Sequence, residues 1–404
     1  MKKKGYNITL GIFIGLIAGV IVGIIMPEWA NTALSVVASI YMSALKMMIF
    51  PLVFTSLVMG IIGIGDIAKT GKVGLHALLW YTGTTALASG LGLVLPRMLH
   101  LGRNAHIVAT KTQVEAATFN GLLDTLQNII PSNPVEAFAT GNMLQVLAFA
   151  VIIGLACLAI KEKADSFVNL CDSIYQISIF IISKIMYVTP FGVFACIATV
   201  MYSNGIDTML QLGQVLLALY ITFYLYAFII YGGMVKLFGK YSPIQFFKDV
   251  APAALNAFGT CSSSATIPLS LKCATEKIGI PEEITSLTLP LGATINMDAV
   301  SILMSFMITF FASALGIDLS MGTMVTVLAC NVLLSIGTPG VPGGAIAAFA
   351  ALCPIAGIPT NQILGVYISV NTLCDMGATC VNVLGDLACS TVLKQTLHFE
   401  KVKK

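Results

Sequence analysis

Long apolar runs, more than any motif, constrain what this chain can fold into. Between Asp318 and Lys394 only Asp375 and Asp386 carry charge, and similar runs recur along the whole sequence. In hydrocarbon an unpaired backbone group costs several kcal/mol, so spanning segments must pair their own backbone, as helices do. About 20 apolar residues suffice for one helical crossing. The candidate spans are residues 8–26, 34–64, 73–99, 142–160, 167–201, 208–238, 284–316 and 362–393.

The charged residues agree with a polytopic protein of the lipid bilayer. They make up 10% of the chain, whereas soluble proteins carry about 25%. The first apolar run follows three lysines but lacks an A-x-A cleavage site, so we expect it to be retained. A net charge of +3 is too small to indicate a nucleic-acid partner.

Lysine and arginine are concentrated in alternate loops, which predicts the orientation of the chain. By the positive-inside rule both termini are cytoplasmic, in the plasma (inner) membrane. This requires an even number of crossings, and eight fits. The loop with Arg97, Arg103 and Lys111 is an exception. The basic residues that follow the rule are Lys2, Lys3, Lys4, Lys69, Lys72, Lys161, Lys163, Lys236, Lys240, Lys248, Lys394, Lys401, Lys403 and Lys404.

The cysteines and histidines form no recognisable metal motif. Nearly all ten cysteines lie inside apolar spans, without a CxxC pair, and no HExxH occurs. We expect the cysteines to be small buried thiols.

Two polar, glycine- and proline-rich segments interrupt the apolar pattern. They are NAFGTCSSSATIPLS at 256–270 and SIGTPGVPGGA at 335–345. Neither can continue as a helix, because proline removes a donor and glycine weakens helical preference. Irregular backbone at membrane depth is tolerated only against protein or a water-filled cavity. We therefore interpret each as the tip of a re-entrant hairpin, the first entering from the cytoplasm and the second from outside.

Each hairpin is followed by an apolar helix with polar side chains, which is the pattern of an inverted repeat. Such repeats place a binding site near the bilayer midplane. On the last helix Asp375, Thr379, Asn382 and Asp386 project within roughly 60° of one another. The earlier helix carries Asn296 and Asp298, in the sequence TINMD.

Three carboxylates among these residues need partners, and no Lys or Arg lies in either helix. Carboxylate, amide and carbonyl oxygens favour a hard cation. Divalent sites usually gather more carboxylates, so a monovalent ion such as Na⁺ fits better. The alternatives are a neutral, protonated aspartate and a structural hydrogen-bond network.

At these residues the chain resembles the glutamate/neutral amino acid transporter family, the dicarboxylate/amino acid:cation symporters. The matching pieces are CSSSATIPLS, LPLGATINMDA, SIGTPGVPGG and DMGATCVNVLGD, in the family's order, and spans match over nearly the whole chain. The resemblance implies an all-α polytopic membrane protein with eight transmembrane helices and two re-entrant helical hairpins, working as an elevator-type transporter.

The resemblance also implies a homotrimer whose subunits combine a fixed scaffold with a mobile transport domain. Residues 1–72 (spans 1 and 2) and 105–205 (spans 4 and 5) would form the scaffold. Residues 73–104 (span 3) and 206–404 (span 6, both hairpins, spans 7 and 8) would form the transport domain. Uptake would be driven by Na⁺, with the second hairpin as the gate.

The implied roles of single residues follow from their motif positions. Asp375 would hold the substrate's α-ammonium, and Ser263, Asn382 and the backbone near Ser262 and Val341 its α-carboxylate. The implied substrate site comprises Ser262, Ser263, Val300, Val341, Gly343, Asp375, Ala378, Thr379 and Asn382. Up to three Na⁺ ions are implied. The first would bind Gly292, Asn296, Asn382 and Asp386; the second Thr294, Ser335, Ile336 and Thr338; the third Tyr81, Thr84, Thr85, Asn296 and Asp298.

Three departures from the pattern of acidic-substrate members predict a neutral amino acid. Ala378 and Cys261 stand where such members carry arginines, and Val300 replaces a threonine. A side-chain carboxylate would enter a pocket without a cation, at a cost of several kcal/mol. The alternative is a proton-coupled, or acidic amino acid or dicarboxylate, symporter of the same fold.

Two less favoured alternatives for the function are an intramembrane protease and a cation channel. The serine triplet has no histidine or lysine base nearby in sequence. Asp375 and Asp386 are about 16 Å apart along one helix, too far to share a proton as an aspartic dyad does. A channel would leave the ammonium-sized niche at Asp375 without a purpose, so we expect a transporter and no enzyme.

Overall fold

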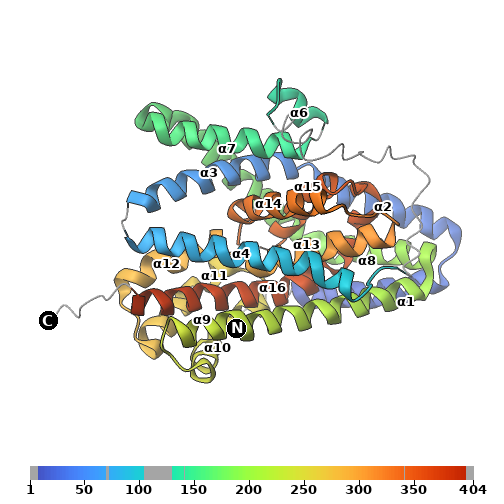
Figure 1. Cartoon of the computed structure of the whole chain (residues 1–404). Coiled ribbons are helices and arrows are strands. Elements are labelled where there is room, and N and C mark those ends of the chain that lie inside the picture. The colour runs from blue at the N-terminus through green and yellow to red at the C-terminus, as the bar shows by residue number, and fades with distance from the viewer. Residues whose placement is uncertain (1–7, 70–71, 104–129, 141, 341, 397–404) are drawn as a thin grey trace, which may run out of the picture.

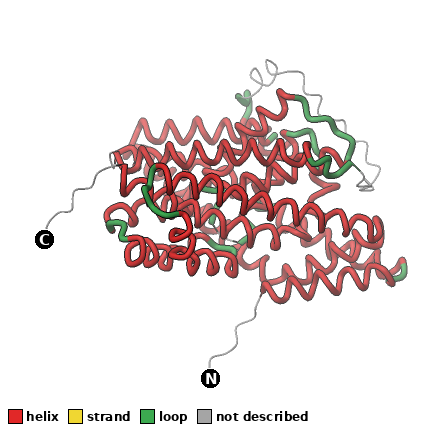
Figure 2. The backbone as a smooth tube through the Cα atoms, turned by 60° about the horizontal axis from the view of Figure 1, so that its bottom comes forward, coloured by secondary structure: helices red, strands yellow, loops and turns green. Residues whose placement is uncertain are grey.

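The computed structural model describes residues 8–69, 72–103, 130–140, 142–340 and 342–396. Every regular element in those ranges is helical, in agreement with the expected all-α class. The helices lie alongside one another in one bundle (Figures 1 and 2).

The helices before the first hairpin are α1 (Ile8–Ile25), α2 (Glu28–Lys46), α3 (Ile49–Lys69), α4 (Lys72–Met98), α6 (Pro134–Thr140), α7 (Met143–Ile160), α8 (Asp165–Tyr226) and α9 (Gly232–Leu237). The later helices are α10 (Pro243–Thr260), α11 (Ser263–Lys272), α12 (Glu282–Ile295), α13 (Asp298–Ala314), α14 (Met321–Gly337), α15 (Gly344–Ile355) and α16 (Thr360–Thr396). A 3₁₀ turn, η1 (Lys161–Ala164), precedes α8, and two π-helical turns, η2 (Ala227–Tyr231) and η3 (Cys273–Ile278), follow α8 and α11.

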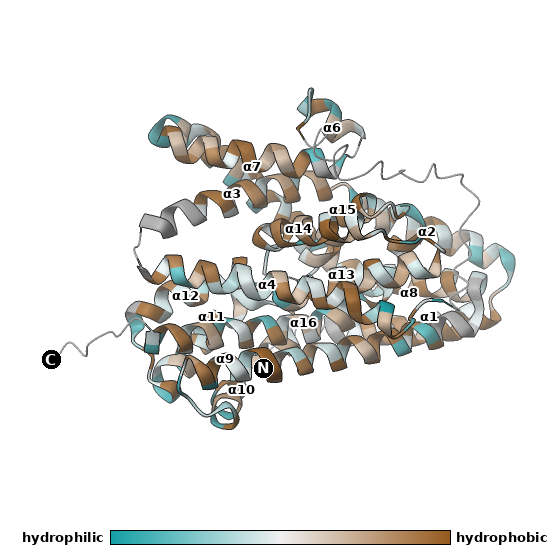
Figure 3. Ribbon diagram, in the orientation of Figure 1, coloured by the Kyte–Doolittle hydropathy of each residue, from teal (hydrophilic) through white to brown (hydrophobic). Residues whose placement is uncertain are grey.

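Six helical stretches in the described residues are long and apolar enough to cross a bilayer, so the chain is a multi-pass membrane protein. One of them, Gln145–Ser203, covers the two predicted spans 142–160 and 167–201, because α7, η1 and α8 follow without a gap. The stretch Gly11–Ile25 is apolar but shorter. Figure 3 shows hydrophobic residues along α7 and much of α3, as expected for helices that face lipid. Eight crossings remain a prediction.

The two helices that carry the acidic residues lie at the centre of the bundle. The apolar windows of Ile284–Ala314 and Thr360–Thr396 are 100% buried, against 28% for Gln145–Ser203. Helix α16 packs against α8, α10, α12 and α13, and α13 packs against α4. The polar residues of α13 and α16 are therefore shielded by protein rather than by lipid.

Both predicted interruptions are confirmed as breaks between helices. Helix α10 ends at Thr260, Cys261 takes a left-handed φ of 50°, and the Ser262 side chain caps α11 by accepting from Ala265 N at 3.1 Å. The second break separates α14 from α15 between Gly337 and Gly344. Each segment thus forms a helical hairpin, and its re-entrant course through the membrane stays a prediction.

Further breaks divide spans that the sequence analysis treated as continuous. Asn296, with φ −87° and ψ 75°, separates α12 from α13 within the predicted span 284–316. A turn at Met47 separates α2 from α3 within 34–64. Helix α8, in contrast, joins the two predicted spans 167–201 and 208–238, with a non-helical joint between them at Gly205, where φ is 72° and ψ −175°.

A stripe of glycines lets α1 approach α8 closely. A methyl group on Gly15 would overlap Pro190 O, and one on Gly19 or Gly23 would lie 2.9 Å from Ile197 Cβ or 2.6 Å from Met201 Cβ. This is the small-xxx-small pattern by which membrane helices bring their backbones together.

We expect Gly19→Ala to lower the melting temperature of the purified protein. Overpacking of this kind costs about 1–3 kcal/mol. Gly213→Ala in α8 is the matched control, because a methyl group there meets no atom within 4 Å. Equal melting temperatures for the two variants would show that the α1–α8 contact is not tight.

Candidate cation and substrate site

The unwound turn between α12 and α13 brings Asn296 against α16. Its Nδ2 donates to Asp386 Oδ1 at 2.8 Å, and Asn382 Oδ1 accepts from the backbone N–H of Ala299 at 2.8 Å. Asn296, Asn382 and Asp386 are all buried. Residues 86 and 90 positions apart in sequence thus form one polar cluster, as the predicted first ion site requires.

Asp298 begins α13 and is contacted by hydroxyl groups from three other elements, α4, α8 and η2. Thr85 Oγ1 donates to Asp298 Oδ1 at 2.6 Å, and Tyr231 OH donates to Oδ2 at 2.8 Å. Tyr226 OH lies 3.2 Å from the same Oδ2 and 2.8 Å from Thr84 O, so its one proton serves either acceptor. Asp298 is completely buried, and the helix N-terminus favours its negative charge.

The donor set fits a monovalent cation. Asn296 Oδ1 is buried and has no hydrogen-bond partner among the described residues, while the Nδ2 of the same side chain contacts Asp386. In the described part of the chain, no lysine or arginine pairs with Asp298 or Asp386, whose partners are neutral amide and hydroxyl groups. An orphaned amide oxygen beside uncompensated carboxylates is the chemistry that a hard cation completes.

Gly292 lies where a larger side chain would enter this cluster. A methyl group on Gly292 would overlap Asp386 Oδ1 and lie 2.9 Å from the phenolic oxygen of Tyr81. Tyr81 is buried and donates to Thr288 O at 3.0 Å. Gly292, a predicted ligand of the first ion, therefore lies against Asp386, with which it would share that ion, and Tyr81, predicted for the third ion, lies beside the same glycine.

The residues predicted for the second ion are only partly brought together. Ser335 and Thr338 lie at the end of α14, where Thr338 N donates to Ser335 O at 3.3 Å, and Ile336 lies between them. Thr294 is exposed, and its hydroxyl donates to Leu291 O of its own helix. No hydrogen bond in the described residues links Thr294 to the α14 group, so this set stays a prediction.

The two hairpin tips touch each other. Ser262 Oγ donates to Gly340 O at 2.9 Å, and Ser264 N approaches the same oxygen at 3.3 Å. Ser263 is buried beside them. Val341, predicted to contact the substrate, lies outside the described residues.

The tip of the second hairpin also contacts Asp375. The backbone of Gly343 hydrogen-bonds to the Asp375 carboxylate, and Thr379 Oγ1 donates to its Oδ1 at 3.3 Å. Asp375 and Thr379 are buried. The carboxylate predicted to hold an ammonium group is thus covered by the predicted gate.

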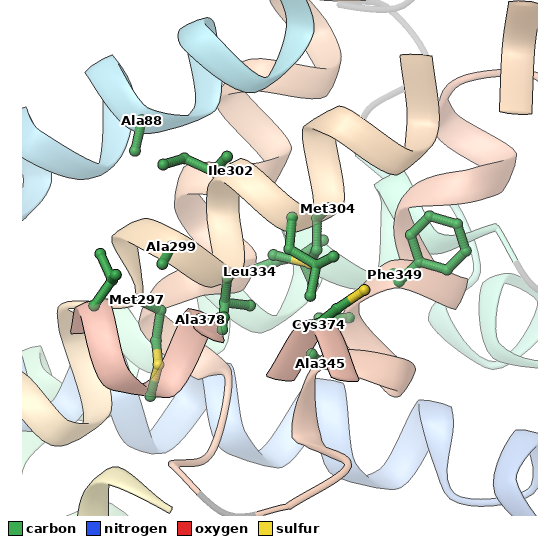
Figure 4. Close-up of a cluster of buried hydrophobic side chains, with 14 of the residues drawn as sticks. Ala88, Met297, Ala299, Ile302, Met304, Leu334, Ala345, Phe349, Cys374 and Ala378 are labelled. Atoms are coloured by element: carbon green, nitrogen blue, oxygen red, sulfur yellow. The ribbon is translucent and has the colours of Figure 1, made fainter. Parts of the chain in front are cut away.

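Ala378, which the sequence analysis predicts to influence substrate charge, lies among apolar side chains. Ala378 is completely buried, and Figure 4 shows it in one hydrophobic cluster with Leu334 and Cys374. Val300 is buried in the same core.

Sequence analysis missed two groups of buried polar residues. Tyr226, the last residue of α8, and Tyr231, at the end of the π-helical turn that follows, reach Asp298, and no sequence pattern used above indicates this turn. Asn331 of α14 donates through Nδ2 toward Ser305 Oγ at 2.7 Å and Ser89 Oγ at 3.0 Å. Asn331 could have been identified from the sequence, since it is an isolated amide in an apolar helix.

We expect Gly292→Ala to weaken Na⁺ binding by about ten-fold or more, the range seen when groups around a metal ligand are disturbed. The measurement is the rise in melting temperature with NaCl, against choline chloride at equal ionic strength. Gly83→Ala is the control, because its methyl group meets no atom within 4 Å. An unchanged response in Gly292→Ala would remove Gly292 from the ion site.

Comparison with known proteins identifies the family. The sequence profile of the sodium:dicarboxylate symporter family matches residues 8–396. A proton/sodium-glutamate symport protein of Bacillus caldotenax is 29% identical, over 89% of this chain and 86% of its own length. C4-dicarboxylate transport proteins of Bacillus subtilis (30% identical; 90% and 87%) and of Geobacter sp. strain M21 (31%; 83% and 77%) are also similar. The chain belongs to the sodium:dicarboxylate symporter family and is a transporter, not an enzyme.

Proposed function

We propose that this cation-coupled symporter uses Na⁺ to drive uptake of a small carboxylate-bearing solute. The observation that carries the proposal is the pair of buried carboxylates, Asp298 and Asp386, whose partners among the described residues are neutral, together with the buried Asn296 Oδ1, which has no hydrogen-bond partner among those residues. A cation that binds there neutralises a charge that is otherwise costly inside the membrane. Each net charge moved inward adds about 2.3 kcal/mol of driving force per 100 mV.

The first candidate substrate is an acidic amino acid or dicarboxylate. The similar proteins are named for glutamate and for C4-dicarboxylates, so the comparisons favour this class and lend no support to the predicted neutral amino acid. Asp375 favours glutamate or aspartate within the class, because a buried carboxylate beside Thr379 is suited to an ammonium group. The hydroxyl of Ser263, the amide of Asn382 and the backbone near Ser262 would serve the α-carboxylate.

A neutral amino acid is the second candidate, because the pocket supplies no compensating cation. Ala378 lies buried in an apolar cluster, and no Lys or Arg occurs from Asp298 to Leu393. A second carboxylate on the substrate would be desolvated there without a partner, which is strongly unfavourable. An acidic substrate would therefore need its extra charge balanced by a bound cation or proton.

We further propose that the substrate moves with an elevator domain. Residues 73–104 and 206–404 would travel against a scaffold of residues 1–72 and 105–205, in a homotrimer. The buried polar centre on α13 and α16 supports this division, as do large exposed apolar side chains on the scaffold helices, such as Ile21 (55% exposed), Ile40 (65%) and Phe180 (60%).

Uptake into proteoliposomes with an imposed Na⁺ gradient tests the function. Labelled glutamate, aspartate, succinate, alanine, serine and threonine should be compared in one preparation. Accumulation that requires Na⁺ supports the proposal. Accumulation that persists in choline and follows a pH gradient would assign the coupling to protons instead.

We expect Asp375→Asn to reduce uptake of amine-bearing substrates on the order of 100-fold, since a buried charge partner contributes several kcal/mol. Succinate, which has no amine, should bind as before if it is carried at all. Substrate competition against a labelled amino acid measures both. Undiminished amino-acid affinity in the variant would place the ammonium group elsewhere.

We expect Ala378→Arg to raise the ratio of acidic-substrate uptake to neutral amino acid uptake by about ten-fold or more, because the guanidinium can pair bidentately with a side-chain carboxylate. Ala378→Leu is the control for added volume without charge. A ratio that stays the same in a folded, Na⁺-responsive Arg variant would show that Ala378 does not face the substrate side chain.

A further inference from the structure

Two phenols that the ion-site prediction does not include hold one oxygen of Asp298. Tyr231 OH is 2.8 Å and Tyr226 OH 3.2 Å from Oδ2, while Thr85 is the donor on Oδ1. Both tyrosines are buried, and their rings meet edge to face at 5.3 Å between centroids. The two hydroxyl groups that contact the carboxylate therefore belong to buried rings that pack against each other.

The π-helical turn is what allows both tyrosines to face Asp298. In an α-helix, residues five apart differ by about 140° around the axis, which would direct one ring away. The turn η2 widens the helix at Ala227–Tyr231, and its i→i+5 repeat matches the spacing of Tyr226 and Tyr231. Such turns occur frequently at functional sites.

We propose that Tyr226 and Tyr231 are positioning residues of the cation site, which hold Asp298 by Oδ2 and so present Oδ1 alone to the ion. The inference rests on the proposed Na⁺ coupling and assigns a role to residues outside the predicted ligand set. Tyr231 donates to Oδ2, and Tyr226 adds a second donor there when its proton is not on Thr84 O, whereas Oδ1 accepts from Thr85 and keeps one lone-pair direction open.

A carboxylate held in this way also selects for ion size. Groups around a metal ligand fix its orientation and the distance at which it can bind. With Asp298 anchored, a smaller ion such as Li⁺ cannot draw the carboxylate inward, so Na⁺ is favoured. Release of Oδ2 would let the side chain rotate and shorten its contact, and the discrimination between the two ions would fall.

The test is the ion dependence of the melting temperature of the purified full-length protein, which needs no transport. Wild type, Tyr231→Phe and Tyr226→Phe are titrated with NaCl and LiCl, with choline chloride keeping ionic strength constant. Tyr231→Phe should raise the half-saturating Na⁺ concentration about ten-fold and bring the Na⁺ and Li⁺ values closer. Tyr226→Phe should act in the same direction but less, since its proton is shared with Thr84 O.

Tyr241→Phe is the matched control. Tyr241 precedes α10, and its phenol also donates to a carboxylate, Asp249 Oδ2 within α10, at 2.7 Å, which is not part of the predicted ion site. It should match wild type in both salts. Wild-type ion dependence in Tyr231→Phe and Tyr226→Phe would overturn the inference while leaving Na⁺ coupling intact. A wild-type protein that responds equally to Na⁺, Li⁺ and choline would overturn the proposed coupling, and the inference with it.

Discussion

The structure depends on acidic groups held in an apolar interior by neutral partners. Asp298, Asp375 and Asp386 are buried, and their described hydrogen-bond donors are hydroxyls, amides and backbone N–H groups rather than lysine or arginine. Neutral donors orient a carboxylate but do not cancel its charge, and a net charge at membrane depth is costly. In the proposed mechanism the missing positive charge comes from bound ions and an amine-bearing substrate, whose binding would then contribute to the stability of the fold.

The broken helices are the means by which the backbone reaches this centre. The turn at Asn296 releases a side chain toward α16, and the two hairpin tips meet at Gly340. Unwound backbone of this kind would be expensive against lipid, but α13 and α16 are enclosed by other helices. The outer helices, with apolar side chains toward the surroundings, therefore enclose a space in which irregular backbone is kept away from lipid.

Sequence reasoning located what depends on composition and local pattern. Proline and glycine at 256–270 and 335–345 indicated both breaks, and isolated polar residues indicated Asn296, Asp298 and Asp386. It did not identify the break at Asn296, because the turn within TINMD has no proline or glycine to mark it. The π-helical turn at Ala227–Tyr231 was also missed, because an inserted residue changes helical phase without changing composition. The grouping of Ser89, Ser305 and Asn331 depends on tertiary packing between three helices, which one sequence does not specify.

Substrate charge is where residue chemistry and family likeness point in different directions. The apolar surroundings of Ala378 disfavour a second carboxylate, whereas the similar proteins are named for substrates that carry two. The two can be reconciled if an additional cation accompanies an acidic substrate. In that case the stoichiometry of coupling, rather than a fixed arginine, sets which substrates are accepted.

The joint at Gly205 bears on how the proposed transport domain could move while it stays covalently linked to the scaffold. It lies at the boundary between the proposed scaffold, ending at 205, and the proposed moving part, beginning at 206. Its φ of 72° is readily available to glycine, and a methyl group at this position would meet no atom within 4 Å. Rotation about the φ and ψ bonds of Gly205 would let the two parts of α8 change their relative orientation during the proposed movement. The helical segments on either side would then keep their packing.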